Sequence, residues 1–77
     1  MTNEDIALRL RHHASELSRT GDNLYRVRAF RQAALVVQGL PEPVETILTV
    51  RGRGALEQVP GIGRSLAETI ATFAKAA

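Results

Sequence analysis

Residues 56–70 have the sequence LEQVPGIGRSLAETI, and this stretch decides the fold. Pro60, Gly61 and Gly63 stand between two short segments whose apolar residues recur at helical spacing. Because apolar residues lie in helical register on both sides, the pattern predicts two helices packed against each other across a very tight turn. Ile62, between the two glycines, is expected to point inward and to pin that turn.

The start of the final helix is a predicted anion site. A helix N-terminus offers unpaired N–H groups and about half a positive charge. Gly61 and Gly63 have no side chain, so a phosphate can approach their main chain directly. Arg64 and Ser65 follow in the first turn and add a guanidinium and a hydroxyl. These residues, together with the main chain of Ile62, predict phosphate contacts that do not depend on base identity. The alternative is that both glycines only end helices.

Glycines and prolines divide the rest of the chain into helical segments. Thr2 or Asn3 can cap the first helix, Asn23 can cap the second, and Pro43 suits the first position of the third. No segment alternates apolar and polar residues as a strand would. The predicted helices cover residues 3–19, 24–38, 43–50, 55–59 and 63 or 64–75. We therefore expect one all-α domain over residues 1–77, a compact four-helix fold with its hairpin at about 56–70.

The composition argues against several classes of protein. The chain has no cysteine, which excludes a disulfide framework and a thiolate zinc site. His12 and His13 are adjacent, and side chains about 100° apart on a helix cannot share one metal ion. We expect one of them to pack and the other to be solvated. Glu16 is placed to pair with His12, and a pH-sensitive DNA contact is the alternative role for the histidines.

The N-terminal residues are acidic and polar, unlike a signal peptide. No apolar run approaches the roughly 20 residues that a bilayer requires. The sequence therefore predicts a soluble cytoplasmic protein with no membrane partner, nucleoid-associated if the source is bacterial.

Arginine dominates the basic residues. The net charge is only +2, but Lys75 is the sole lysine among ten basic residues. Arginine forks suit phosphate, so the composition favours nucleic acid as a partner. Arg26, Arg28 and Arg31 lie on the second helix, where a solvated basic face and a second DNA contact are both compatible with the pattern. We expect Arg26 to face the nucleic acid.

Three further residues have two possible roles each. Arg51 and Arg53 either flank the path of the phosphates or keep their glycine-rich loop soluble. Tyr25 follows the cap of the second helix, where it either packs or stacks on a base.

Two stretches resemble a known family. LEQVPGIGRSLAETI, residues 56–70, resembles the helix-hairpin-helix motif, an element that binds the DNA backbone. GDNLYRVRAFRQAA, residues 21–34, resembles the second helix of the N-terminal, DNA polymerase beta-like domain of family X DNA polymerases. Their order and spacing match over about residues 6–73. The resemblance implies a four-helix domain that binds DNA, with gapped or single-stranded DNA as the partner and DNA repair as the process.

The same resemblance implies a monovalent cation at the hairpin. In the family, backbone carbonyls hold the ion, which helps to bridge to a phosphate. The matching positions here are the carbonyl oxygens of Glu57, Val59 and Ile62, for Na⁺ or K⁺. No other cofactor is expected.

The resemblance also bears on catalysis. Family members that act as deoxyribose-phosphate lyases form a Schiff base through a lysine of the last helix. The matching residue here is Thr69, whose hydroxyl cannot form an imine. A supporting lysine is replaced by Ser65, an assisting tyrosine by Phe30, and a phosphate-binding lysine by Arg26, which keeps the charge. We therefore expect a protein that binds DNA without being an enzyme.

Two alternatives stay open. The first alternative is a protein-interaction or scaffolding module on the same fold. The second is the N-terminal DNA-binding domain of a family X polymerase with residual lyase activity. The modest net charge and the missing lysines favour the first of these.

Overall fold

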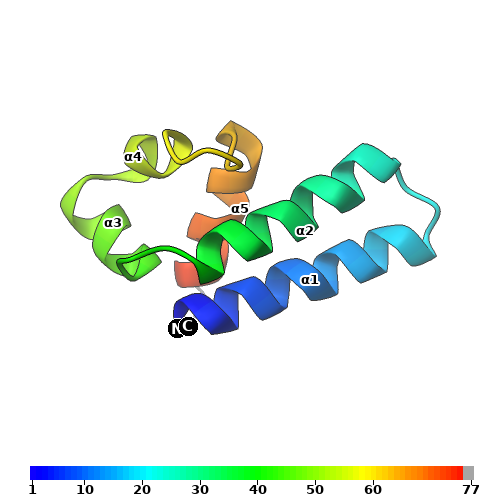
Figure 1. Cartoon of the computed structure of the whole chain (residues 1–77), viewed down its shortest axis with the longest axis horizontal. Helices are drawn as coiled ribbons and strands as arrows, with labels where there is room; N and C mark the ends of the chain where they lie inside the picture. Colours follow the sequence, from blue (N-terminus) through cyan, green and yellow to red (C-terminus); the bar gives the residue numbers. More distant parts are fainter. Residues whose placement is uncertain (76–77) are drawn as a thin grey trace.

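Five helices make up the computed structural model, which describes residues 1–75 (Figure 1). The described part contains no strand, so the all-α prediction is confirmed. The helices are α1 (Asn3–Arg19), α2 (Leu24–Gln38), α3 (Val44–Val50), α4 (Arg53–Glu57) and α5 (Arg64–Lys75). Four of them have seven or more residues, which agrees with the predicted four-helix domain.

The two long helices begin at side-chain caps, as expected. The Thr2 hydroxyl accepts a hydrogen bond from the Asp5 amide at 3.1 Å, and the Asp5 carboxylate accepts one from the Thr2 amide at 3.0 Å. This reciprocal capping box satisfies two amides that an α-helix would otherwise leave unpaired. At α2, the Asn23 side chain accepts a hydrogen bond from the Tyr25 amide at 2.8 Å. Local chemistry therefore fixes where both helices start.

Asn3 does not cap its own helix but ties α1 to α3. Its Nδ2 donates to the Glu42 carbonyl, and its Oδ1 accepts from the Val44 amide, both at 2.8 Å. Pro43 is the residue before α3 and not its first helical residue. The predicted start of α3 is therefore wrong by one position. Pro43 is in an extended conformation (φ −62°, ψ 141°), and the helix begins at Val44, whose amide Asn3 caps.

The start of α4 also differs from the prediction. The sequence predicts a helix over residues 55–59, but α4 covers Arg53–Glu57. Gly52 has a φ of +83°, which makes the turn and lets the next residue enter the helix. At the other end, Val59 belongs to the hairpin turn because its carbonyl accepts a hydrogen bond from the Ile62 amide at 3.0 Å.

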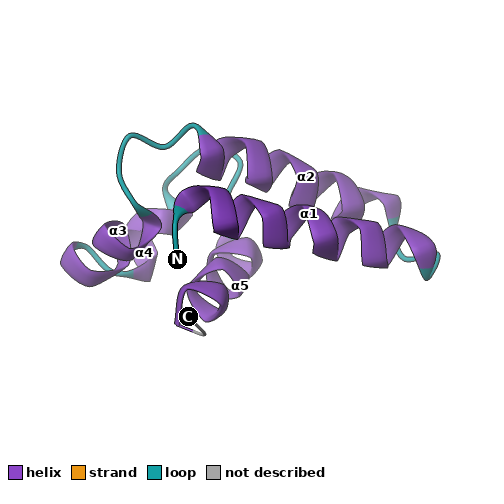
Figure 2. Ribbon diagram, turned by 90° about the horizontal axis from the view of Figure 1, so that it is seen from below, coloured by secondary structure: helices purple, strands orange, loops and turns teal. Residues whose placement is uncertain are grey.

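The hydrophobic core lies where the helices converge. The two long helices pack along each other, and α5 crosses behind them (Figures 1 and 2). The largest fully buried side chains come from all five helices: Ile6, Leu10, Val37, Val44, Leu56 and Ile70. The N-terminal half of α2 extends beyond α4 and α5, and among residues 1–75 only α1 lies beside it (Figures 1 and 2).

Candidate functional site

The hairpin between α4 and α5 is built around a type II turn. The Ile62 amide donates to the Val59 carbonyl at 3.0 Å, which closes the turn. Pro60 occupies the second position, where its fixed φ is favourable, and Gly61 occupies the third with a φ of +92°. Ile62 is only 2% exposed, so the prediction that it points inward is confirmed.

Gly61 lies directly on α2. A Cβ atom at this position would meet Val36 Cγ2 at 2.9 Å and Gln32 Cγ at 3.8 Å. A side chain at Gly61 would therefore need both a left-handed backbone and the displacement of Val36. The fold itself requires this glycine, because it allows the hairpin to rest against the second long helix.

Gly63 has a different environment. Its φ is not in the left-handed region, and a Cβ atom there would meet nothing within 4 Å. The folded chain could therefore carry a larger residue at Gly63 without strain. Because Gly63 has no side chain, the N-terminus of α5 is open to solvent at this position.

The amides at the N-terminus of α5 belong to exposed residues and are unpaired. Within residues 1–75, the N–H groups of Gly61, Gly63, Arg64 and Ser65 make no hydrogen bond to protein. All four residues are exposed. By contrast, the Ile62 amide is used by the turn. Four unpaired donors therefore lie at, or just before, the positive end of a twelve-residue helix, a position suited to an oxyanion.

Two arginines lie on the helices of the hairpin, Arg64 on α5 and Arg53 on α4. Arg64 is the first residue of α5 and is exposed. Arg53 of α4 lies 3.5 Å from Glu68 of α5, an ion pair that links the two helices of the hairpin. Both members of this pair are at least half exposed, so its contribution to stability is small. Its effect is to hold one guanidinium near the first turns of α5.

Arg26 lies elsewhere. Its Nη1 donates to Asp22 Oδ2 at 3.4 Å, and it is exposed. It precedes Gln32, which approaches the hairpin, by six residues, or about 9 Å of helix and a rotation of about 120°. The structure therefore does not bring Arg26 to the hairpin, and its role in binding stays a prediction.

Three carbonyls of the hairpin form the predicted site for a monovalent cation. Within the described residues, the carbonyl oxygens of Glu57 and Ile62 accept no hydrogen bond, and that of Val59 accepts one. A carbonyl oxygen has two lone pairs, so Val59 keeps one free. Backbone carbonyls are ligands that K⁺ accepts in proteins. The donor set is therefore compatible with such an ion.

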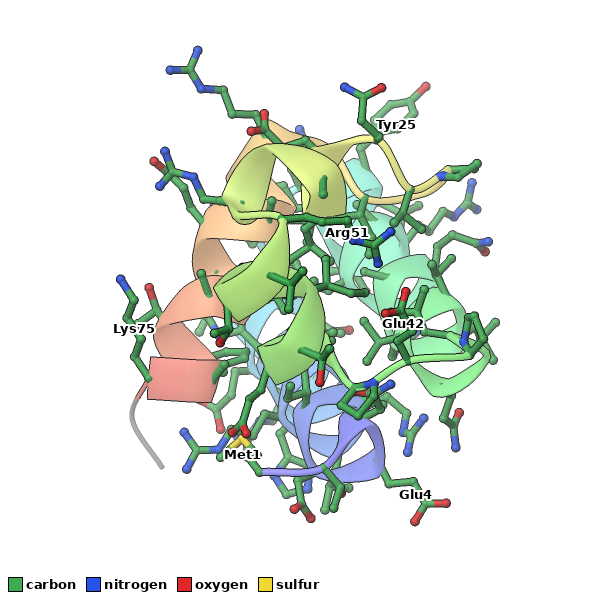
Figure 3. The ribbon with its side chains drawn as sticks, turned by 90° about the vertical axis from the view of Figure 1, so that its left-hand side faces the viewer. Met1, Glu4, Tyr25, Glu42, Arg51 and Lys75 are labelled. Carbon is green, nitrogen blue, oxygen red and sulfur yellow. The ribbon has the colours of Figure 1, made fainter. Side chains whose placement is uncertain are left out.

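The positions that bear on catalysis hold no amine. The Thr69 hydroxyl donates to the Ser65 carbonyl at 3.1 Å, within its own helix. The N-terminal amine pairs with Glu45 of α3 at 3.1 Å. Lys75 is at the far end of α5, eleven residues or about 16 Å from its first residue. Figure 3 shows Met1 near the bottom of the molecule and Lys75 at its left edge, both away from the hairpin loop at the top.

The histidines are divided between packing and solvent. His13 packs on Phe30 with ring centroids 4.6 Å apart, whereas His12 is exposed. Glu16 forms its ion pair with Arg19, at i+3, and not with His12. No group of three or more His, Asp or Glu side chains within residues 1–75 could hold a metal ion.

The structure also shows the surroundings of Tyr25 and Arg51, for which the sequence allowed two roles each. Tyr25 is 82% exposed, which excludes a place in the core, and Figure 3 shows it pointing into solvent. Arg51 pairs with Glu42 of the preceding loop, as the same figure shows. Arg51 is therefore occupied within the protein. None of the helices in residues 1–75 has the length and apolar content to cross a bilayer.

Sequence reasoning missed the support of the hairpin by α2. Val36 and Gln32 lie off the apolar stripe of α2 that forms the core, yet they are the residues that Gly61 approaches. Val36 gave the available signal, since it is an apolar residue outside that stripe. Which segment covers such a residue cannot be deduced from spacing.

Comparison with known proteins gives one match. A family model described as a helix-hairpin-helix domain matches residues 1–76, nearly the whole chain. No curated protein and no solved structure matches it. The family and the hairpin geometry agree, and both point to nucleic-acid binding in general.

Proposed function

Because the chain belongs to the helix-hairpin-helix family, we propose that it binds DNA without regard to sequence, through backbone phosphates held at the hairpin. The amides of Gly61 and Gly63 donate to phosphate oxygens, with the Ile62 main chain holding the turn between them. The guanidinium of Arg64 supplies charge, and the hydroxyl of Ser65 supplies a further donor. These contacts position a strand without reading its bases.

The proposal rests mainly on the open, unstrained environment of Gly63. The fold does not require glycine there, because neither the backbone conformation nor a neighbouring atom excludes a side chain. Glycine leaves the adjacent amides accessible, and those amides make no hydrogen bond within the described residues. A direct approach of phosphate to the main chain explains both facts.

The expected affinity is modest. One hairpin reaches about two to four phosphates, so log K against log salt should have a slope of about −2 to −4. The dissociation constant for plain duplex should lie near the ~10⁻⁴–10⁻⁶ M of non-specific binding. Fluorescence anisotropy with duplex, gapped and single-stranded DNA, at several salt concentrations, measures both quantities. Equal affinity for unrelated sequences supports the proposal. The absence of salt-dependent binding to all three forms would refute it and favour a protein-interaction module.

A matched pair of variants tests whether the hairpin is responsible. Gly63→Leu places a side chain over the free amides and is expected to weaken binding about ten-fold or more, because losing one hydrogen bond to a charged group costs about 1.5 kcal/mol or more. Gly54→Leu is the control, because Gly54 is also unstrained and open but lies in α4. Gly61 is unsuitable for this test, since any side chain there meets Val36. Equal affinity of the folded Gly63→Leu variant and the wild type would contradict the assignment.

A monovalent cation, Na⁺ or K⁺, is part of the proposal. The carbonyl oxygens of Glu57, Val59 and Ile62 would hold it and leave it facing the bound phosphate. At equal ionic strength, DNA affinity should then be higher in K⁺ or Na⁺ than in a large organic cation. Equal affinity in all three salts would argue against the ion.

We further propose that the domain is not a lyase. The position that matches the Schiff-base lysine is Thr69, and the two amines of Met1 and Lys75 lie away from the hairpin. Borohydride treatment of the protein with abasic DNA should therefore trap no covalent adduct. A trapped adduct would show that one of the two amines reaches the DNA.

The narrower likeness to the N-terminal domain of family X DNA polymerases is also a proposal. It rests on the second-helix sequence together with the hairpin. A preference for gapped over intact duplex in the same titration would support it, and with it a role in DNA repair.

A further inference from the structure

The nine arginines differ in whether the protein already uses their charge. Four of them pair with carboxylates: Arg19, Arg26, Arg51 and Arg53. Two others make polar or aromatic contacts, Arg11 with Gln38 at 3.2 Å and Arg9 over Phe73 at 5.8 Å. Within residues 1–75, three form no such interaction: Arg28, Arg31 and Arg64. These three guanidiniums are available to an external anion without breaking an internal pair.

One of the three lies in line with the hairpin. Arg28, Gln32 and Val36 follow one another at four-residue spacing, so each is turned only about 40° from the next on α2. Val36 and Gln32 are the residues that Gly61 approaches. This row therefore leads from beneath the hairpin along the exposed side of α2 to Arg28, about 12 Å away along the helix. Arg31 is turned about 100° from Gln32 and leaves the row.

The surface along this row is open. Gln32 and Arg28 are both exposed, and the N-terminal half of α2 extends past the hairpin (Figure 1). A hollow of about 150 Å³, lined by Leu24, Tyr25 and Arg28, lies at its far end. Among residues 1–75, no other segment therefore covers Gln32 or Arg28 on this side of α2.

We infer that the hairpin and Arg28 form one track for the backbone of a single nucleic-acid strand, with Arg28 and not Arg26 as the second phosphate contact. Arg64 binds one phosphate at the N-terminus of α5, and Arg28 binds another phosphate farther along the same strand. Arg26 is the weaker candidate for two reasons. Binding there would compete with its pair to Asp22, and it lies about 120° around α2 from Gln32. The inference rests on the proposed function and adds the direction in which the strand leaves the hairpin.

Salt titrations of three variants test the track. Removing one side chain that binds a phosphate should reduce the slope of log K against log salt by about 0.9 on duplex or 0.7 on single strand. Arg28→Ala is expected to show that reduction with a short mixed-sequence duplex and with its single strand. Arg26→Ala should reduce the slope less than Arg28→Ala does. Arg19→Ala, which removes a paired arginine of α1, controls for the general decrease in positive charge.

The outcomes separate the inference from the function beneath it. If Gly63→Leu weakens binding but Arg28→Ala keeps the wild-type slope, the hairpin binds DNA and the track is wrong. If Arg26→Ala lowers the slope and Arg28→Ala does not, the strand leaves the hairpin on the other side of α2. If the wild type does not bind, both the proposed function and the track fail. The side chains of Arg19, Arg26 and Arg28 are exposed, so all three alanine variants are expected to fold. Far-UV circular dichroism checks the fold of each variant.

Discussion

Replacing Gly61 with alanine is expected to lower the free energy of unfolding by about 2–4 kcal/mol. Two costs add. An alanine at a φ of +92° costs about 1–2 kcal/mol, because its Cβ crowds its own backbone. The same Cβ would lie 2.9 Å from Val36 Cγ2, and relieving that contact costs about 1–2 kcal/mol, as for a modest overpacking. For a domain of this size the decrease corresponds to about 10–30 °C in melting temperature.

Urea denaturation followed by circular dichroism measures this decrease. A double-mutant cycle with Val36→Ala divides it, because removing Val36 Cγ2 abolishes the clash but leaves the backbone strain. Gly61→Ala should therefore cost about 1–2 kcal/mol less in the Val36→Ala background than in the wild type. A cost below about 1 kcal/mol for the single variant would refute the reasoning. A cycle with no coupling would show that the hairpin does not rest on α2.

Three other substitutions test the remaining structure. Gly54→Ala should raise stability by about 0.5–1 kcal/mol in thermal or urea unfolding, since Gly54 is helical, exposed and unstrained; a destabilised variant would contradict this. Asn3→Ala should cost about 1–3 kcal/mol, because it leaves the part-buried Val44 amide and Glu42 carbonyl without their partner, and an unchanged midpoint would show that water replaces it. The pKa of Asp5 is lowered, first by the hydrogen bond from the Thr2 amide and then by the Thr2 hydroxyl. The Asp5 cap therefore stabilises the fold fully above the pKa that Asp5 has in the unfolded chain. That stabilisation is lost as the pH falls through the lower pKa of the folded state. The stability difference between wild type and Asp5→Asn should therefore shrink on acidification, and a constant difference would contradict the capping role.

Local chemistry explains how much of the fold was predictable. Thr2 and Asn23 cap the helices that follow them, and Ile62 is buried where the spacing of its neighbours requires it. These features depend on residues a few positions apart. The start of α4 was missed because Gly52 and Gly54 look alike in the sequence, although Gly52 makes a turn and Gly54 is helical.

Non-local contacts explain what was not predictable. Gly61 and Gly63 have the same side chain, but only Gly61 lies against Val36, which is 25 residues earlier in the chain. The same holds for Asn3, which caps a helix 41 residues away. Which arginines remain unpaired also depends on where distant carboxylates lie, as Arg53 and Glu68 show. The candidate site was therefore predictable as a motif, whereas its support by α2 was not.

The backbone amide spectrum during a DNA titration tests the central claim most directly. In a two-dimensional ¹H–¹⁵N NMR experiment, a phosphate bound at the N-terminus of α5 should shift the amide protons of Gly63, Arg64 and Ser65 downfield. Each of these amides then gains a charged hydrogen-bond acceptor. The Ile62 amide, already bonded to the Val59 carbonyl, should shift less. If DNA binds and the largest shifts lie on α1 or α3 while the amides of residues 63–65 stay in place, the hairpin does not hold the phosphates.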